Sequence, residues 1–139
     1  MNVYVVIPTF NEAPQIVEDT LKGVLERGYN VVLVDDGSDN EVMLNSGYLP
    51  VHYIRHAVNL GQGASLQTGV DYALKEGADI IVHFDADGQH NADDIEKFIS
   101  RLQVNELDVV LGSRFLNDDH IAAIPAGRRF LLRIARIVN

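Results

Sequence analysis

The chain has 139 residues, a length typical of one domain that buries its own core without covalent cross-links. It contains no cysteine, which excludes disulfides and thiolate metal sites and fits a reducing compartment such as the cytoplasm. The formal net charge of −9 argues against a nucleic-acid-binding protein, because such a protein needs a basic face. No apolar run approaches the ~20 residues of a membrane span, and we expect no signal peptide.

The sequence opens with a strand pattern over Val3–Ile7, which Pro8 is expected to end. A helical pattern follows it. Asn11 is the expected cap of that helix, and Pro14 suits its first turn because a proline lacks the N–H that would have no partner there. Gly28 is expected to close the helix.

Two further apolar runs, Val31–Val34 and Val51–Arg55, predict strands, and the second is less apolar and therefore nearer a sheet edge. The glycine-punctuated segment 59–63 then leads into a helix over Ala64–Glu76, which Gly77 terminates. Its expected buried face consists of Leu66, Val70, Ala73 and Leu74.

The second half continues the alternation with a strand at Ile80–Phe84 and a helix capped by Asn91. That helix is expected to bury Ile95, Phe98, Ile99 and Leu102. Asp108–Gly112 predicts a fifth strand, and Arg128–Val138 has a helical pattern. Strands that alternate with helices at this spacing predict a three-layer α/β domain with a mainly parallel central sheet.

Three of the predicted strands end in polar clusters, at residues 8–12, 35–38 and 85–87. The carboxyl ends of parallel strands share one edge of a sheet, which is where open α/β folds bind ligands. Such a gathering of acidic and amide groups disfavours folding unless it serves a site. The Asp-x-Asp pair by itself is equally consistent with an acidic turn after a strand.

Oxygen ligands without cysteine suit a hard cation such as Mg²⁺ or Mn²⁺. Asp85, Asp87 and Gln89 make an incomplete set for such a cation, which a bound diphosphate would complete. Glu12 and Asp36 are acceptors suited to a nucleobase N–H or a ribose hydroxyl.

Segment 59–63 opens a helix and either presents backbone N–H groups to a ligand or is an ordinary turn. The sequence has neither a Gly-x-Gly-x-x-Gly after the first strand nor a P-loop, which disfavours nicotinamide-binding and P-loop NTPase domains.

Five ordered motifs carry a family resemblance: Pro8-Thr9-Phe10-Asn11-Glu12, Val34-Asp35-Asp36-Gly37-Ser38, Asn59-x-Gly61-x-Gly63-x-x-x-x-x-Gly69, Asp85-Ala86-Asp87-Gly88-Gln89-His90 and Gly112-Ser113-Arg114-Phe115. Together they resemble the inverting glycosyltransferases of family 2, which have the GT-A fold. The nearest branch is the dolichyl-phosphate mannose synthase and undecaprenyl-phosphate glucosyltransferase group.

The resemblance implies that Pro8, Glu12, Asp36, Asn59, Gly61 and Asp85 bind the substrate, most of them through its nucleoside. It also implies that Asp87 and Gln89, with Asp85, hold Mg²⁺ or Mn²⁺, and that Arg114 and Arg128 contact phosphate beside Asp87 as catalytic groups. The implied reaction moves a sugar from a UDP- or GDP-sugar to a polyprenyl phosphate. The alternatives are a saccharide hydroxyl acceptor in cell-surface polysaccharide synthesis and an inactive nucleotide-binding module.

The end of the chain differs in charge from the rest. Residues 1–113 carry 6 basic and 18 acidic side chains, whereas residues 114–139 carry 5 arginines and 2 aspartates. We expect a nucleotide-sugar-binding core over residues 1–127 and the start of a basic amphipathic helix over residues 128–139, which the family would continue further. That helix either meets the cytoplasmic face of a membrane or packs on the sheet with its arginines solvated.

Smaller expectations concern groups beside the motifs. A lipid phosphate is already largely ionised at pH 7, so it needs no general base. Asp118 and Asp119 are therefore expected to be solvated loop residues. His83 is expected to be structural, and His90 either is structural or helps to shape the metal and diphosphate site.

Overall fold

The computed structural model describes residues 1–40 and 50–112 and divides the chain into two compact units, Met1–Ser100 and Arg101–Asn139. The expectations for Arg114, Asp118, Asp119, Arg128 and the helix at 128–138 lie outside the described residues. Within the part that is described, no helix is long and apolar enough to cross a membrane.

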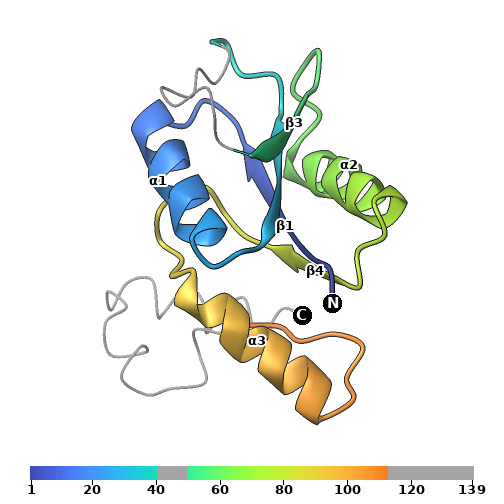
Figure 1. Cartoon of the computed structure of the whole chain (residues 1–139). Coiled ribbons are helices and arrows are strands. Elements are labelled where there is room, and N and C mark those ends of the chain that lie inside the picture. The colour runs from blue at the N-terminus through green and yellow to red at the C-terminus, as the bar shows by residue number, and fades with distance from the viewer. Residues whose placement is uncertain (41–49, 113–139) are drawn as a thin grey trace, which may run out of the picture. The chain divides into compact units, whose positions relative to one another are not determined.

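In the described part of the first unit, a parallel sheet of four strands forms the centre (Figure 1). Its strands are β1 (Val3–Thr9), β2 (Asn30–Asp35), β3 (Val51–Arg55) and β4 (Ile80–His83), in the order β3-β2-β1-β4. The register pairs Val5 of β1 with Val31 of β2 and with Val82 of β4. β3 is an edge strand among the described residues, as its lower apolar content predicted.

Helices α1 (Pro14–Leu25) and α2 (Gln62–Lys75) lie on opposite sides of this sheet (Figure 1). Alternate residues of β1 face the two sides, because successive side chains of a strand point in opposite directions. Val5 and Ile7 pack with α1 and with the start of α3 (Asp93–Val104), whereas Tyr4 and Val6 pack on the α2 side. The predicted three-layer α/β fold is confirmed.

Pro8 does not end the first strand, which continues to Thr9. The carbonyl oxygen of Val6 accepts a hydrogen bond from Phe84 N–H, so the backbone groups of Val6 face β4. Because directions alternate along a strand, the backbone groups of Pro8, two residues further, face the β4 side as well. At the level of Pro8, however, β4 has already ended, because its last paired residue, His83, lies opposite Val6. The N–H that proline lacks therefore has no strand to bond.

Three other predictions about the elements are wrong. The cap position of α1 is Ala13, and Asn11 instead has a φ of 53° and bonds to residues 38 and 39, although Pro14 does stand at the start of the helix. Leu74 is 59% exposed and so does not belong to the buried face of α2. Residues 108–112 form no strand, because apolar runs show a preference for extended backbone but supply no neighbour to pair with.

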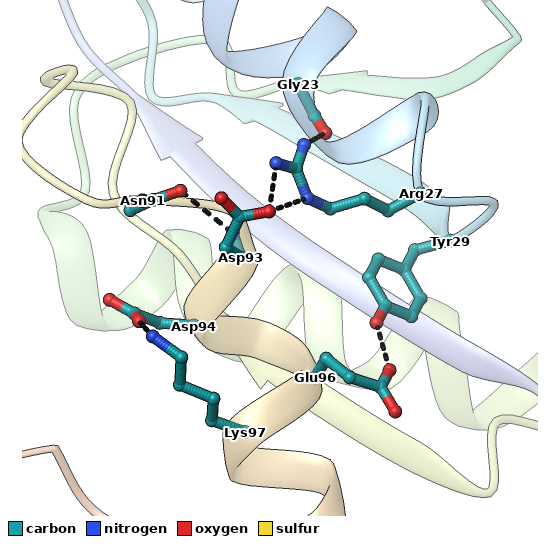
Figure 2. A network of polar contacts seen from close by, with 8 residues as sticks. All are labelled: Gly23, Arg27, Tyr29, Asn91, Asp93, Asp94, Glu96 and Lys97. Carbon is teal, nitrogen blue, oxygen red and sulfur yellow. Dashed lines mark hydrogen bonds and ion pairs between the residues drawn. The ribbon is translucent and has the colours of Figure 1, made fainter.

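The start of α3 is tied to the end of α1 and the start of β2 by surface contacts (Figure 2). The guanidinium of Arg27 donates to Asp93 Oδ1 at 2.5 and 3.1 Å, and Tyr29 donates to Glu96 at 2.9 Å. Asn91 accepts the Asp93 N–H at 2.9 Å, as its predicted capping role requires. The bond from Arg27 holds the pKa of Asp93 below its usual value.

Candidate functional site

A cavity of about 440 Å³ opens at the carboxyl ends of β1, β2 and β4, beside the first turn of α2. It is lined by Pro8, Thr9, Phe10, Glu12, Asp36, Asn59, Gly61, Gln62, Ser65, Asp85, Ala86 and Asp87. Every residue predicted to bind substrate is therefore on one wall or another of the same cavity, together with Asp87. The convergence of strand ends expected from the parallel pattern is present.

Gln89 is the exception among the predicted site residues that the structure describes. It lines a second cavity, of about 350 Å³, together with residues of α1 such as Asp19 and Thr20. The turn that separates it from Asp87 is made by Gly88, whose φ is +72°, a value that favours glycine. The predicted metal-binding trio is thus only partly gathered.

The neighbouring carboxylates Asp35 and Asp36 point to opposite sides of the sheet. Asp35 is fully buried and accepts bonds from Ser38 N–H and Tyr53 O–H, both at 2.9 Å, with the Arg55 guanidinium at 3.2 Å. Burial by itself raises the pKa of Asp35, but these partners outweigh it and hold that pKa below its usual value. Asp35 therefore fixes the loop after β2 and does not reach the cavity.

Asp36 faces the cavity and is also engaged by the protein. Its Oδ1 accepts from Leu60 N–H at 3.0 Å and lies 2.7 Å from His56 Nδ1, and its Oδ2 accepts from Gly61 N–H at 2.7 Å. Burial raises the pKa of Asp36, yet these bonds hold it below the ordinary value. The carboxylate is thus ionised at neutral pH, and it shapes the turn that leads into α2.

Asp85 and Asp87 present their carboxylates to the cavity from the segment after β4. Asp85 accepts a bond from Gln62 Nε2 at 3.1 Å and lies 3.3 Å from His90 Nε2. Asp87 Oδ1 accepts the N–H of Gln89 at 2.9 Å. His90 thus contacts the carboxylate of Asp85, whereas His83 is exposed at the end of its strand.

The carboxylates of Asp85 and Asp87 fit a hard divalent cation only if other oxygen atoms complete its coordination. Among residues 1–40 and 50–112 no group of three or more His, Asp and Glu side chains is arranged to hold a metal ion. Two carboxylates on a cavity wall are nevertheless the protein share that Mg²⁺ takes when substrate phosphates supply the rest. Asp85 and Asp87 are the residues that would hold such an ion.

Sequence reasoning missed five lining residues: Thr9, Phe10, Gln62, Ser65 and Ala86. Thr9 is 3% exposed and, within the described structure, its hydroxyl has no hydrogen-bond partner. Its place directly after Pro8 in the first polar cluster was the available signal. Ser65 lies four residues after Gly61, one helical turn on, so helical spacing was its signal.

Two loops at the mouth of the cavity are tied together. Asn11 and Asp39 bond reciprocally, since the side-chain amide of Asn11 donates to Asp39 at 3.1 Å and its oxygen accepts the Asp39 N–H at 2.9 Å. The N–H of Asn11 also donates to Ser38 Oγ at 2.9 Å. The loop that carries Phe10 and Glu12 is therefore held against the loop that follows Asp36.

Known proteins resemble this chain in sequence and in fold. The family model described as glycosyl transferase family 2 matches residues 4–138. A UDP-N-acetylglucosamine–dolichyl-phosphate N-acetylglucosaminyltransferase of Methanococcus voltae is 32% identical, over 91% of this chain and 57% of that protein. A dolichol-phosphate mannosyltransferase of Pyrococcus furiosus is 31% identical, over 100% of this chain and 40% of that protein.

The solved structure of Staphylococcus aureus TarS, residues 1–349, matches with a TM-score of 0.57 and 17% identity. The match covers 84% of this chain and 40% of that one. This likeness concerns the fold, and it confirms the expected GT-A architecture. The chain spans about half the length of the curated relatives that it matches.

Proposed function

The chain belongs to glycosyl transferase family 2, and from this premise we propose that its cavity binds the nucleotide diphosphate of a UDP- or GDP-sugar. The observation that carries the proposal is the gathering of Glu12, Asp36, Asp85 and Asp87 with the turn at 59–61 around one cavity. Carboxylates accept from nucleobase N–H and ribose hydroxyl groups, and the turn offers backbone N–H groups.

In the proposed site, Pro8, Glu12, Asp36, Asn59 and Gly61 contact the nucleoside side of the donor. Asp85 and Asp87 would hold Mg²⁺ or Mn²⁺ at the diphosphate, and Gln89, which lines the other cavity, is the third residue of the proposed set. When bound, such a cation neutralises the charge that grows on the departing diphosphate.

The proposed reaction is a single displacement at the anomeric carbon of the sugar. An acceptor oxygen forms the new bond on one face while the bond to the diphosphate oxygen breaks on the other, so the configuration inverts. The proposed acceptor is a polyprenyl phosphate, because both relatives named above carry a dolichyl or dolichol phosphate in their names. Its ionised phosphate needs no general base from the protein.

The remaining proposals concern the end of the sequence. We place Arg114 and Arg128 at a phosphate of the acceptor or donor, and we assign residues 128–139 to a helix that meets the cytoplasmic face of a membrane. The 5 arginines of residues 114–139 support this, because each basic residue near an anionic surface contributes about 1 kcal/mol.

The first test of the proposed function is calorimetric titration of UDP and GDP into the chain, with and without Mn²⁺. We expect metal-dependent binding of one nucleotide. We also expect Asp87→Asn to weaken that binding about tenfold to a hundredfold, since it removes one charged metal ligand.

The matched control is Asp71→Asn, which makes the same chemical change on the exposed surface of α2, where Asp71 bonds Gln67. It should bind the nucleotide as the wild type does. The proposal fails if neither nucleotide binds, or if Asp87→Asn and Asp71→Asn have equal affinities for the nucleotide.

A further inference from the structure

A chain of part-buried hydrogen bonds runs from the cavity to the middle of α2. Asp36 Oδ1 lies 2.7 Å from His56 Nδ1, and His56 Nε2 lies 2.9 Å from Thr68 Oγ1. The side chains of His56 and Asp36 are 10% and 4% exposed, so little water reaches the bond between them. Because a carboxylate only accepts, Nδ1 carries the proton that it shares with Asp36.

The backbone places His56 for this contact. It follows β3 directly, and its N–H donates to the carbonyl of Asp35 at 2.8 Å, which extends the pairing of β3 with β2 by one step. His56 itself is not part of the cavity wall. Any influence that it has on a ligand is therefore indirect, through Asp36 or through α2.

Asp36 is the group through which the turn before α2 is held. Each of its oxygens accepts one backbone N–H, from Leu60 and from Gly61, and Asn59 and Gly61 line the cavity. A carboxylate bridging two N–H groups needs one fixed rotamer, and the His56 bond to Oδ1 selects it. Gly61 has a φ of +93°, a conformation that other residues rarely adopt, and the bond to Asp36 selects it from the wide range open to glycine.

We propose that His56 is a positioning residue that orients Asp36 and thereby holds the turn at 59–61 in the shape that receives the nucleotide. The inference rests on the proposed function, since it names the nucleotide as the ligand. The inference assigns different roles to the two hydrogen bonds of the imidazole. The bond to Asp36 determines nucleotide affinity, and the bond to Thr68 only docks α2 on the sheet.

Two substitutions separate these bonds. The amide nitrogen of asparagine is as many bonds from Cα as Nδ1 of histidine. The amide nitrogen of glutamine is as many bonds from Cα as Nε2 of histidine. His56→Asn therefore keeps a donor for Asp36 and loses Thr68, whereas His56→Gln keeps a partner for Thr68 and loses Asp36. Each variant gives up one hydrogen bond.

The experiment measures nucleotide affinity by calorimetry for the wild type and both variants. We expect His56→Asn to bind within about twofold of the wild type, and His56→Gln to bind about tenfold more weakly, since a hydrogen bond to a charged group is lost. Equal affinities of the two variants would overturn the inference.

A second measurement needs no ligand. Amide hydrogen exchange at Leu60 and Gly61 should be faster in His56→Gln than in His56→Asn, while exchange at the buried strand residue Val32 stays equal. If the wild-type chain binds neither nucleotide, the proposed function fails, and these exchange rates still decide whether His56 holds the turn.

The control for a purely structural effect is the other imidazole link between β3 and α2. His52 Nδ1 lies 2.7 Å from Tyr72 Oη, and neither residue lines the cavity. Tyr72→Phe removes this bond and should leave nucleotide affinity unchanged. A loss of affinity in Tyr72→Phe as large as that in His56→Gln would show that docking of α2, and not orientation of Asp36, is what matters.

Discussion

The two sides of the sheet are held in different ways. On the α1 side, β1 and β2 pack large aliphatic side chains against Val17, Leu21 and Val24 of α1 and against Ile95 and Ile99 of α3. On the α2 side, the buried apolar cluster of the described residues is small: Tyr4, Val6, Val32, Val34 and Ala73. There the helix brings small residues, Ser65, Gly69 and Ala73, to the sheet.

The difference separates stability from geometry. Apolar packing is strong but non-directional, so we expect the α1 side, which reaches the cavity wall through Ala86, to contribute mainly to stability. Hydrogen bonds are weaker in net terms but directional, and those of Asp36, His56 and Thr68 fix the α2 side, which forms a wall of the cavity. We therefore expect substitutions on the two sides to affect different measurements.

The largest expected effect is on the α1 side. Leu21→Ala should destabilise the chain by about 2 to 5 kcal/mol, because Leu21 is fully buried and a cavity would remain. Urea unfolding measures this loss, and nucleotide affinity of the folded fraction should not change. The matched control is Leu74→Ala on α2, where the same change at a side chain 59% exposed should cost less than about 0.5 kcal/mol.

A smaller effect in stability, but a larger one in binding, is expected from Gly69→Ala on the α2 side. An added Cβ would lie 2.2 Å from Val6 Cγ1, and because Val6 is fully buried we expect α2 to move away from the sheet. We expect a loss of about 1 to 3 kcal/mol in urea unfolding and weaker nucleotide binding, since α2 carries lining residues. The double variant with Val6→Ala removes the obstructing methyl and should recover affinity. Unchanged affinity in Gly69→Ala would contradict the comparison.

The smallest effect concerns Asp35, which belongs to the α1 side although it neighbours Asp36. Tyr53→Phe removes one donor to its carboxylate and should cost about 1.5 kcal/mol at pH 7. The pKa of Asp35 is lowered on folding, so its stabilisation is present above the unfolded pKa of about 3.9 and is lost as pH falls through the folded pKa. The free energies of unfolding of Tyr53→Phe and the wild type, measured with urea, should therefore differ less below about pH 4.

Periodicity and strand-end chemistry predicted most of the fold and the membership of the cavity. The continuous apolar runs at Val3–Ile7 and Val31–Val34 predicted β1 and β2, and the parallel arrangement brought Glu12, Asp36 and Asp85 together. The sequence could not show that Asp36 is already bonded to His56, because that contact joins residues 20 apart whose pairing depends on the register of β2 and β3.

The errors have the same origin. Asn11 has the composition of a helix cap, but its tertiary partner Asp39 draws it into a left-handed conformation outside the helix. Residues 108–112 have the composition of a strand, yet Val109 and Leu111 are 69% and 84% exposed and pair with no strand in the described structure. Local propensity indicates which backbone conformations a segment can adopt. The tertiary partners available to the segment determine which of them it adopts.

The strand order has a consequence for synthesis of the chain. β1 is made first and lies inside the sheet, but its contact with β4 joins residues as far apart as Asn2 and Asp79, 77 positions later. Pairing across so long a loop is slow, because its ends must meet before any contact rewards them. Until His83 has left the ribosome, β4 is incomplete and the β4-facing edge of β1 has no strand to pair with. A nascent chain that ends before His83 therefore exposes this apolar edge to pairing with other chains.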